Sequence, residues 1–193
     1  MFKTRIFDLG NVLIFFDHEL ACSALGALYG REPSAIQGFL FDSGLEWEFE
    51  KGLLTALDLH RRFAEWSGRD DVSVAAMKRA QSDIFTLNHP MVDELRSCKA
   101  SGLRTVLLSN TSESHIEFAR ERYDFFQYFD AQVLSFEVQA MKPERKIFEA
   151  ALAVAEARPE ECFYLDDIPE YVAAAAEVGI CGRVYQVLTE RKF

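Results

Sequence analysis

The chain has 193 residues, of which 49% are hydrophobic and 27% charged, and its formal net charge is −10. This composition is typical of a globular protein whose length suits one domain, or one domain with a sizeable insertion. Acidic residues are spread along the chain and no basic stripe interrupts them, which argues against nucleic acid or an anionic membrane as a partner. If the ligand is an anion, a metal ion or a few basic residues must offset this charge locally.

No apolar run approaches the roughly 18 residues of a membrane-spanning helix, and the N-terminus lacks the apolar region of a signal peptide. Four cysteines lie far apart, with no CxxC pair and no nearby pair of histidines: Cys22, Cys98, Cys162 and Cys181. This pattern is typical of buried, reduced thiols and not of disulfides or a zinc site. We expect a cytoplasmic protein that forms a monomer or a homodimer.

Short apolar segments alternate with helical patterns along most of the chain. The expected strands are Lys3–Asp8, Arg104–Ser109, Ala131–Leu134, Cys162–Leu165 and Arg183–Val187. The expected helices are Pro90–Ala100, Ser114–Tyr123, Pro143–Ala155 and Tyr171–Val178. Proline suits the first turn of a helix, so Pro143 is expected to open the third of these. Strands that alternate with helices predict an α/β fold with a doubly wound parallel sheet.

The segment between the first two expected strands is far too long for one crossover connection. Its apolar residues keep helical spacing from about Asp17 to Leu87, and Thr55 and Ser73 are expected N-caps. We therefore expect an α/β core made of residues 1–16 and 88–193. A helical cap of residues 17–87 would be inserted into it after the first strand.

Polar side chains follow the carboxyl ends of four expected strands. Asp8 ends the first, Ser109–Thr111 end the second, Lys142 comes shortly after the third, and Asp166–Asp167 end the fourth. Ligands of doubly wound sheets bind beyond the carboxyl ends of the strands, so we expect these groups to converge at one edge. Each is ordinary turn or cap chemistry when taken singly, but their joint occurrence in this order favours a catalytic site.

The order and spacing of these residues resemble the haloacid dehalogenase superfamily, and within it the phosphatases with a helical cap after the first motif. The matching motifs are Phe7-Asp8-Leu9-Gly10-Asn11-Val12, Leu108-Ser109-Asn110-Thr111, Lys142-Pro143 and Leu165-Asp166-Asp167-Ile168-Pro169-Glu170. The first motif is similar to a branch that includes phosphatases of sugar phosphates such as glucose 1-phosphate. The resemblance implies a Rossmann-like core with the first strand at its centre, and a small phosphorylated metabolite as substrate.

The resemblance also implies a role for each residue that would meet the phosphoryl group. Asp8 would attack phosphorus and form an aspartyl-phosphate, which splits one difficult displacement into two easier ones. Ser109 and Asn110 would donate hydrogen bonds to phosphate oxygens. Lys142 would hold Asp8 and the phosphoryl group together and keep the two anions from repelling each other.

A magnesium site is implied by the same motifs. Asp8, the main-chain carbonyl of Gly10 and Asp166 would hold Mg²⁺, with waters completing an all-oxygen shell. Asp167 would be a further ligand through water or a group that orients the others. Together with Lys142, the ion would supply the local positive charge that this acidic chain needs at an anion site.

Gly10 is the main departure from the family pattern. The phosphatases usually carry an aspartate there, two residues after the nucleophile, which protonates the leaving group and later activates water. Such general acid–base help is typically worth roughly 10²- to 10⁴-fold in rate. Three interpretations stay open: a phosphatase whose leaving group needs little protonation, a 2-haloacid dehalogenase acting without metal, and a phosphate-binding or regulatory relic. The Asp166–Asp167 pair favours the phosphatase, because the dehalogenase branch lacks such a pair.

A sugar 1-phosphate would suffer least from a missing acid, because an anomeric hydroxyl leaves more easily than an ordinary alcohol. Asp17 and His18, at the hinge of the expected cap, are alternative sources of the acid, although a helix start explains them better. In the cap, aromatic residues at helical spacing usually form a core. The candidate substrate contacts there are Trp47, Phe49, Glu50 and Lys51. No role is assigned to the remaining histidines, which show no ligand spacing: His60, His89 and His115.

Overall fold

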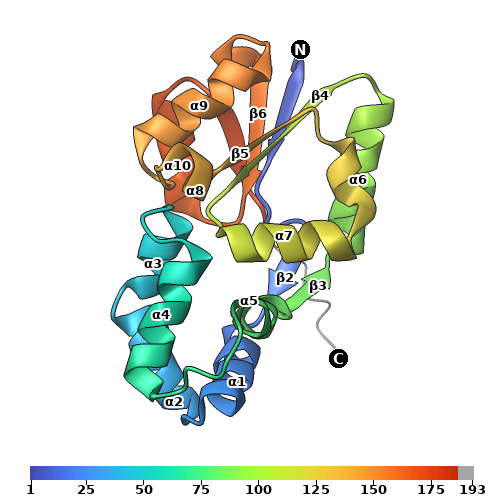
Figure 1. Cartoon of the computed structure of the whole chain (residues 1–193). Helices are drawn as coiled ribbons and strands as arrows, with labels where there is room; N and C mark the ends of the chain where they lie inside the picture. The colour runs from blue at the N-terminus through green and yellow to red at the C-terminus, as the bar shows by residue number, and fades with distance from the viewer. Residues whose placement is uncertain (187–193) are drawn as a thin grey trace, which may run out of the picture.

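A parallel sheet of five strands forms the centre of the molecule in the computed structural model, which describes residues 1–186 (Figure 1). Its strands are β1 (Thr4–Phe7), β4 (Arg104–Ser109), β5 (Ala131–Leu134), β6 (Cys162–Asp166) and β7 (Cys181–Val184). They lie in the order β5-β4-β1-β6-β7, and every neighbouring pair is parallel. The predicted doubly wound sheet with the first strand at its centre is confirmed.

The edge strand β7 differs most from its prediction. It begins at Cys181, where it pairs with Phe163 of β6, two residues before the expected start. Because glycine is depleted in strands, Gly182 gave no signal that the strand begins before Arg183. Val187, the last residue of the expected strand, lies outside the described residues.

Helices cover both faces of the sheet. On one face lie α6 (His89–Ala100) and α7 (Glu113–Arg122), and on the other α9 (Arg145–Ala155) and α10 (Pro169–Glu177) (Figure 1). Successive strand residues point to opposite faces, so β1, β4, β5 and β6 each contribute residues to two hydrophobic clusters. The first includes Phe7, Leu107, Leu95 and Ile116, and the second includes Ile6, Val106, Phe148 and Ala175.

The prediction that Pro143 opens α9 is wrong, because the helix begins at Arg145. Glu144 N donates to Met141 O at 2.6 Å, which closes a tight turn around Lys142 and Pro143. Pro143 thus belongs to the turn that presents Lys142. Shorter helical turns elsewhere in this part of the chain are Asp124–Tyr128, α8 (Ser135–Val138) and Pro159–Glu161.

Residues between the first and second strands of the sheet are mainly helical, as expected. The helices are α1 (His18–Tyr29), α2 (Pro33–Gln37), α3 (Leu45–Glu50), α4 (Ala56–Ser67) and α5 (Val74–Ser82), with a π-helical turn at Gly38–Asp42. They share a hydrophobic cluster of their own, which includes Leu25, Ile36, Phe49, Phe63 and Met77. Figure 1 shows this group beyond the carboxyl ends of the strands. In the part of the chain that the structure describes, no helix is both long and apolar enough to cross a membrane.

The predicted N-caps of α4 and α5 are confirmed. Thr55 Oγ1 accepts a hydrogen bond from Asp58 N, and Ser73 Oγ accepts one from Ala76 N. Asp17 is a third cap, since its Oδ1 accepts from Glu19 N at 2.9 Å. A helix start therefore explains Asp17.

Two short strands that the sequence did not predict join the helical segment to the sheet. They are β2 (Ile14–Phe16) and β3 (Phe85–Leu87), which pair antiparallel. Asn88 secures this junction, because its N donates to Leu13 O at 2.9 Å and its Nδ2 to Val12 O at 2.6 Å. Three-residue strands are too short for an alternating pattern to stand out.

Candidate active site

Three charged side chains meet in a buried cluster, which we call the core cluster: Asp8 and Asp166 at the ends of β1 and β6, and Lys142 in the turn before α9. Lys142 Nζ donates to Asp8 Oδ1 at 2.6 Å and to Asp166 Oδ2 at 2.7 Å. All three side chains are buried, with Lys142 4% and Asp166 0% exposed. The structure thus brings together residues that stand far apart in the sequence.

Burial and pairing have opposite effects on these groups. Burial raises the pKa of Asp8 to about 7, while the attraction of Lys142 acts to lower it. Burial lowers the pKa of Lys142, but the carboxylates of Asp8 and Asp166 outweigh it and raise that pKa above its ordinary value. Lys142 is therefore charged at neutral pH. With the neighbouring Asp167, three carboxylates face one ammonium group, so an anionic ligand would need a further cation.

The two adjacent aspartates after β6 have different surroundings. Asp166 Oδ2 accepts from Lys142 and from the hydroxyl of Tyr164, and its Oδ1 accepts from Ile168 N at 2.8 Å. Asp167 is half-buried, lines the pocket described below, and accepts from Asn11 Nδ2 at 3.2 Å. Burial raises the pKa of Asp167. Asp166 is thus occupied by protein donors, and Asp167 is the one exposed to a ligand.

The donor set at this edge suits a hard divalent cation. Carboxylate oxygens of Asp8, Asp166 and Asp167 lie within 4.8 Å of one another. Oxygen ligands of this kind are those that Mg²⁺ and Ca²⁺ prefer. The three residues therefore fit the metal that the sequence implied.

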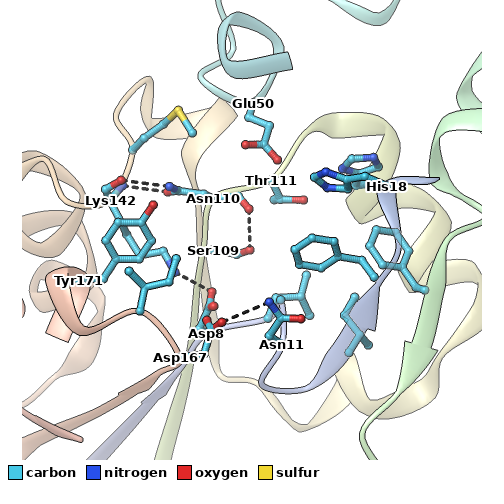
Figure 2. A pocket seen from close by; sticks show the side chains of 18 of the residues that line it. Asp8, Asn11, His18, Glu50, Ser109, Asn110, Thr111, Lys142, Asp167 and Tyr171 are labelled. Carbon is cyan, nitrogen blue, oxygen red and sulfur yellow. Dashed lines mark hydrogen bonds and ion pairs between the residues drawn. The ribbon is translucent and has the colours of Figure 1, made fainter. Parts of the chain in front are cut away.

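Ser109 and Asn110 end β4 beside this cluster. Ser109 is buried at the base of the pocket and its Oγ donates to Asn110 O at 3.2 Å. The side chain of Asn110 is engaged twice by the next loop: its Oδ1 accepts from Lys142 N at 2.8 Å and its Nδ2 donates to Lys142 O at 3.1 Å (Figure 2). The amide that we expected to reach a phosphate thus fixes the main chain of Lys142.

A pocket of about 340 Å³ opens between the strand ends and the helical segment (Figure 2). Its floor includes Asp8, Ser109, Lys142 and Asp167, while Phe16, Trp47, Ile84 and Phe85 give it apolar walls. A mainly apolar cavity with a small number of convergent polar groups is typical of a small-molecule site. The core cluster therefore faces a cavity that can receive a ligand.

The cap residues expected to contact substrate divide into two groups. Trp47 and Glu50 line the pocket. Phe49 is buried in the helical cluster, as aromatic residues at helical spacing usually are. Lys51 Nζ forms an ion pair with Glu144 Oε1 at 2.7 Å and lies 4.7 Å from the centre of the Trp47 ring.

Several pocket residues had no role assigned from the sequence. Asn11 adopts the left-handed conformation, with φ of 54°, and this directs its amide to Asp167. His115 of α7 and Tyr171 of α10 also line the pocket. Asn11 stands inside the first motif, which was a usable signal, whereas His115 and Tyr171 had no local pattern.

His18, which the sequence offered as an alternative source of the acid, also lines the pocket. Its ring stacks between Phe16 and Phe41, with ring centres 4.9 and 4.5 Å away.

A residue larger than glycine at position 10 would require the ring of Phe16 to move. A Cβ atom added there would lie 2.9 Å from Phe16 Cε1, which is closer than side-chain carbons approach. The ring of Phe16 thus stands beside the position for which the family resemblance implied an aspartate. The chain not only lacks that aspartate but places an aromatic ring next to its site.

A family model described as haloacid dehalogenase-like hydrolase matches residues 2–179. The chain belongs to this family. The motifs at the ends of β1, β4 and β6 and the strand order around them are therefore those of a haloacid dehalogenase-like hydrolase.

Two curated relatives match nearly the whole chain. Sesquiterpene phosphatase astK of Aspergillus oryzae is 25% identical over 186 residues, which cover 94% of this chain and 88% of the relative. D-ribitol-5-phosphate phosphatase of Bacteroides thetaiotaomicron is 25% identical over 189 residues, covering 93% and 89%.

Solved structures agree with the fold of this hydrolase. A HAD family enzyme from Bacteroides thetaiotaomicron, crystallised with magnesium and inorganic phosphate, superposes with a TM-score of 0.85 at 26% identity and covers 100% of this chain and 98% of that chain. L-2-haloacid dehalogenase from Xanthobacter autotrophicus has a TM-score of 0.67 at 18% identity, covering 98% and 80%. The second similarity concerns the fold alone.

Proposed function

We propose that this hydrolase is a Mg²⁺-dependent phosphatase of small phosphorylated metabolites and works through an aspartyl-phosphate on Asp8. The observation that carries the proposal is the core cluster itself. A carboxylate held 2.6 Å from a buried ammonium group, beside further carboxylates and at the floor of a pocket, suits nucleophilic attack on a phosphoryl group. Both relatives named above are phosphatases.

Each core residue has one proposed task. Asp8 attacks phosphorus, and Lys142 neutralises the nucleophile and the incoming phosphoryl oxygens. Ser109 donates a hydrogen bond to the phosphate from the end of β4. Asn110 holds the main chain of Lys142 in place, which the two hydrogen bonds between them support.

For the metal, we propose Asp8, the carbonyl of Gly10 and Asp167 as the protein ligands. Asp166 then orients Lys142, because it is fully buried and its oxygens already accept from Lys142, Tyr164 and the main chain. Mg²⁺ bound there would neutralise phosphoryl oxygens during transfer. This assignment differs from the prediction made from the sequence. There Asp166 was a direct ligand, and Asp167 was either a ligand through water or a group that orients the others.

The substrate that we propose is a phosphomonoester of about the size of a sugar phosphate, with glucose 1-phosphate as one candidate. The pocket volume of about 340 Å³ and its apolar walls support a small organic leaving group. We also propose that residues 17–87 act as a cap that closes this pocket over the core of residues 1–16 and 88–193. A cytoplasmic location stays a prediction.

A phosphatase screen tests the proposal. The protein is assayed with Mg²⁺ against sugar, nucleotide and alkyl phosphates, and phosphate release is measured. We expect release from at least one class, loss of activity with EDTA and its return with Mg²⁺. Asp8→Asn should lower the rate by more than about 10³-fold.

Chloride release from 2-chloropropionate in EDTA is measured in parallel. Dehalogenation without metal, or phosphate release that persists in Asp8→Asn, would contradict the proposed function. Phosphate binding by wild-type protein without any turnover would favour the non-enzymatic alternative.

A further inference from the structure

A second buried cluster lies on the cap side of the pocket, and the proposed function uses none of its members. It consists of Glu46 and Glu50 on α3 and His115 on α7, whose carboxylate and imidazole atoms lie within 4.8 Å of one another. We call it the cap cluster. Glu50 and His115 line the pocket, whereas Glu46 is buried behind them.

The two carboxylates are close to each other, and among residues 1–186 neither forms an ion pair with a lysine or arginine. Glu46 and Glu50 stand four residues apart on one helix, so they share a face. His115 Nδ1 lies 4.0 Å from Glu46 Oε1, but burial lowers the pKa of His115 to about 4, so its imidazole is neutral near pH 7. The remaining partner of Glu46 is Gln81, whose Nε2 donates to Glu46 Oε2 at 2.8 Å. Glu46 is buried and Glu50 half-buried, and two carboxylates whose oxygens lie within 4.8 Å of each other cannot readily ionise together, so the pair retains a proton.

Cations near Glu50 are engaged elsewhere. Lys142 faces it from the core but forms its ion pairs with Asp8 and Asp166. Lys51, the next residue, pairs with Glu144. Burial raises the pKa of Glu50 to about 7, with Lys142 acting in the opposite direction.

Contacts with the core fix the position of Glu50. Ser135 Oγ donates to Glu50 O at 2.6 Å, so the end of α3 is joined to α8, which follows β5. Gly52 packs so closely on α8 that an added Cβ would lie 2.2 Å from Phe136 O. The ion pair of Lys51 with Glu144 adds a third contact. Figure 2 shows the carboxyl group of Glu50 directed into the pocket on the side opposite Asp8.

We propose that Glu50 is the general acid and base that replaces the aspartate missing at Gly10. The inference rests on the proposed function and adds the proton transfers to it. A leaving group bound between Asp8 and the cap side of the pocket would face Glu50, whereas Phe16 stands beside the usual site of the acid.

The proposed proton transfers balance over two steps. In the first, an oxygen of Asp8 bonds to phosphorus, the phosphorus–oxygen bond of the ester breaks, and the leaving oxygen takes the proton of Glu50 to depart as an alcohol. In the second, Glu50 as carboxylate takes a proton from the water that attacks phosphorus. The bond between phosphorus and Asp8 then breaks, which releases phosphate and restores both residues.

Glu50→Gln tests this role by the leaving group. With 4-nitrophenyl phosphate, whose leaving group needs no protonation, we expect a rapid burst of about one equivalent of 4-nitrophenolate followed by slow turnover, because only the second step lacks its base. With an alkyl phosphate we expect no burst and a kcat lower by roughly 10²- to 10⁴-fold, with little change in KM. Glu48→Gln, on the same helix and outside the pocket, is the matched control and should behave as wild type.

The pH profile gives a second readout. Titratable groups that face Glu50 are Glu46 from its own helix, His115 from α7, Lys142 from the core and Tyr171 from α10. For wild type, kcat/KM with the alkyl phosphate should fall above about pH 7, as Glu50 loses its proton. This alkaline limb should be absent in Glu50→Gln and present in Glu48→Gln.

Wild-type protein supplies a measurement that does not depend on folding of the variant. Across aryl phosphates with leaving groups of graded pKa, kcat/KM should change little, since Glu50 protonates the poorer leaving groups. A steep dependence of kcat/KM on the leaving-group pKa would overturn the role of Glu50. The same conclusion would follow if Glu50→Gln gave a burst with both substrates or turned over as fast as wild type. If Asp8→Asn keeps the activity, the proposed function fails instead.

Discussion

The core cluster and the cap cluster face each other across one pocket, and their carboxylates are neutralised in different ways. In the core, Lys142 lies 2.6 and 2.7 Å from two carboxylates, so the ionised forms are paired. In the cap, Glu46 and Glu50 have a neutral imidazole and an amide as neighbours, so a proton takes the place of the cation. Burial raises the pKa of both Asp8 and Glu50 to about 7, so the two carboxyl groups differ in their partners. The ammonium group of Lys142 stabilises the ionised, nucleophilic form of Asp8, whereas Glu46 and His115 supply no positive charge that would hold Glu50 in its ionised form.

Removal of the core cation should have the largest effect. In Lys142→Met, two buried carboxylates lose their partner, which typically costs about 3–5 kcal/mol of stability, and phosphatase activity should be lost with it. Urea denaturation near neutral pH in EDTA measures the loss. Lys51→Met, which breaks a more exposed pair with Glu144, should cost only about 0–1 kcal/mol. Equal losses would show that pairing does not distinguish the core cluster.

Disturbing the contact that anchors the cap cluster to the core should have the second-largest effect. Gly52 has a φ of 72° and lies against the carbonyl of Phe136 in α8. Gly52→Ala should therefore strain the backbone and move Glu50 away from α8. We expect a loss of roughly 1–3 kcal/mol in stability and a larger loss of kcat than in Gly68→Ala. Gly68 also has a positive φ, of 75°, but no atom within 4 Å of its added Cβ. Urea denaturation measures the stability of both variants, and phosphate release measures their kcat. A similar loss of kcat in both would show that the contact with Phe136 is unimportant.

The cap cluster should also show itself in the pH dependence of stability. A glutamate titrates near pH 4.3 in an unfolded chain, whereas burial raises the pKa of Glu50 to about 7 in the folded protein. Its contribution to stability is therefore fully present below the unfolded pKa and is lost as the pH rises through about 7. Glu50→Gln keeps a neutral side chain at every pH. We expect equal Tm values for variant and wild type near pH 4, and a Tm higher by several degrees for the variant at pH 8.

Thermal unfolding in EDTA between pH 4 and pH 8 measures this difference. Glu48→Gln serves again as control and should follow wild type. Parallel curves for wild type and Glu50→Gln would mean that Glu50 titrates as it does in water, and would remove the distinction between the two clusters.

Restoring an acid on the core side should have the smallest effect. Gly10→Asp alone would bring its side chain against Phe16, so the double variant with Phe16→Ala is the better test. It should raise kcat for an alkyl phosphate more than for a sugar 1-phosphate, because the anomeric hydroxyl is the better leaving group. An equal increase of kcat for the two substrates would contradict the proposed relation between Gly10 and the choice of substrate. The Phe16→Ala single variant gives the baseline.

Much of the fold could be predicted because its signals are local. Adjacent buried apolar residues mark the two central strands, Ile6-Phe7 in β1 and Val106-Leu107-Leu108 in β4. The caps Thr55 and Ser73 act within one turn of their helices. The pairs β2–β3 and β6–β7 could not be predicted as reliably, because short or glycine-containing strands are defined by the partner to which they bond.

For the candidate site, the sequence by itself determined which groups stand at the strand ends, since a carboxylate after an apolar strand is a local pattern. Only the tertiary structure decided how each group is used. Asp166 is enclosed while Asp167 faces the pocket, and Asn110 is bound to the loop of Lys142. His115 joins two glutamates from a distant helix. Burial, pairing and protonation depend on contacts between segments far apart in the chain, and no local pattern contains them.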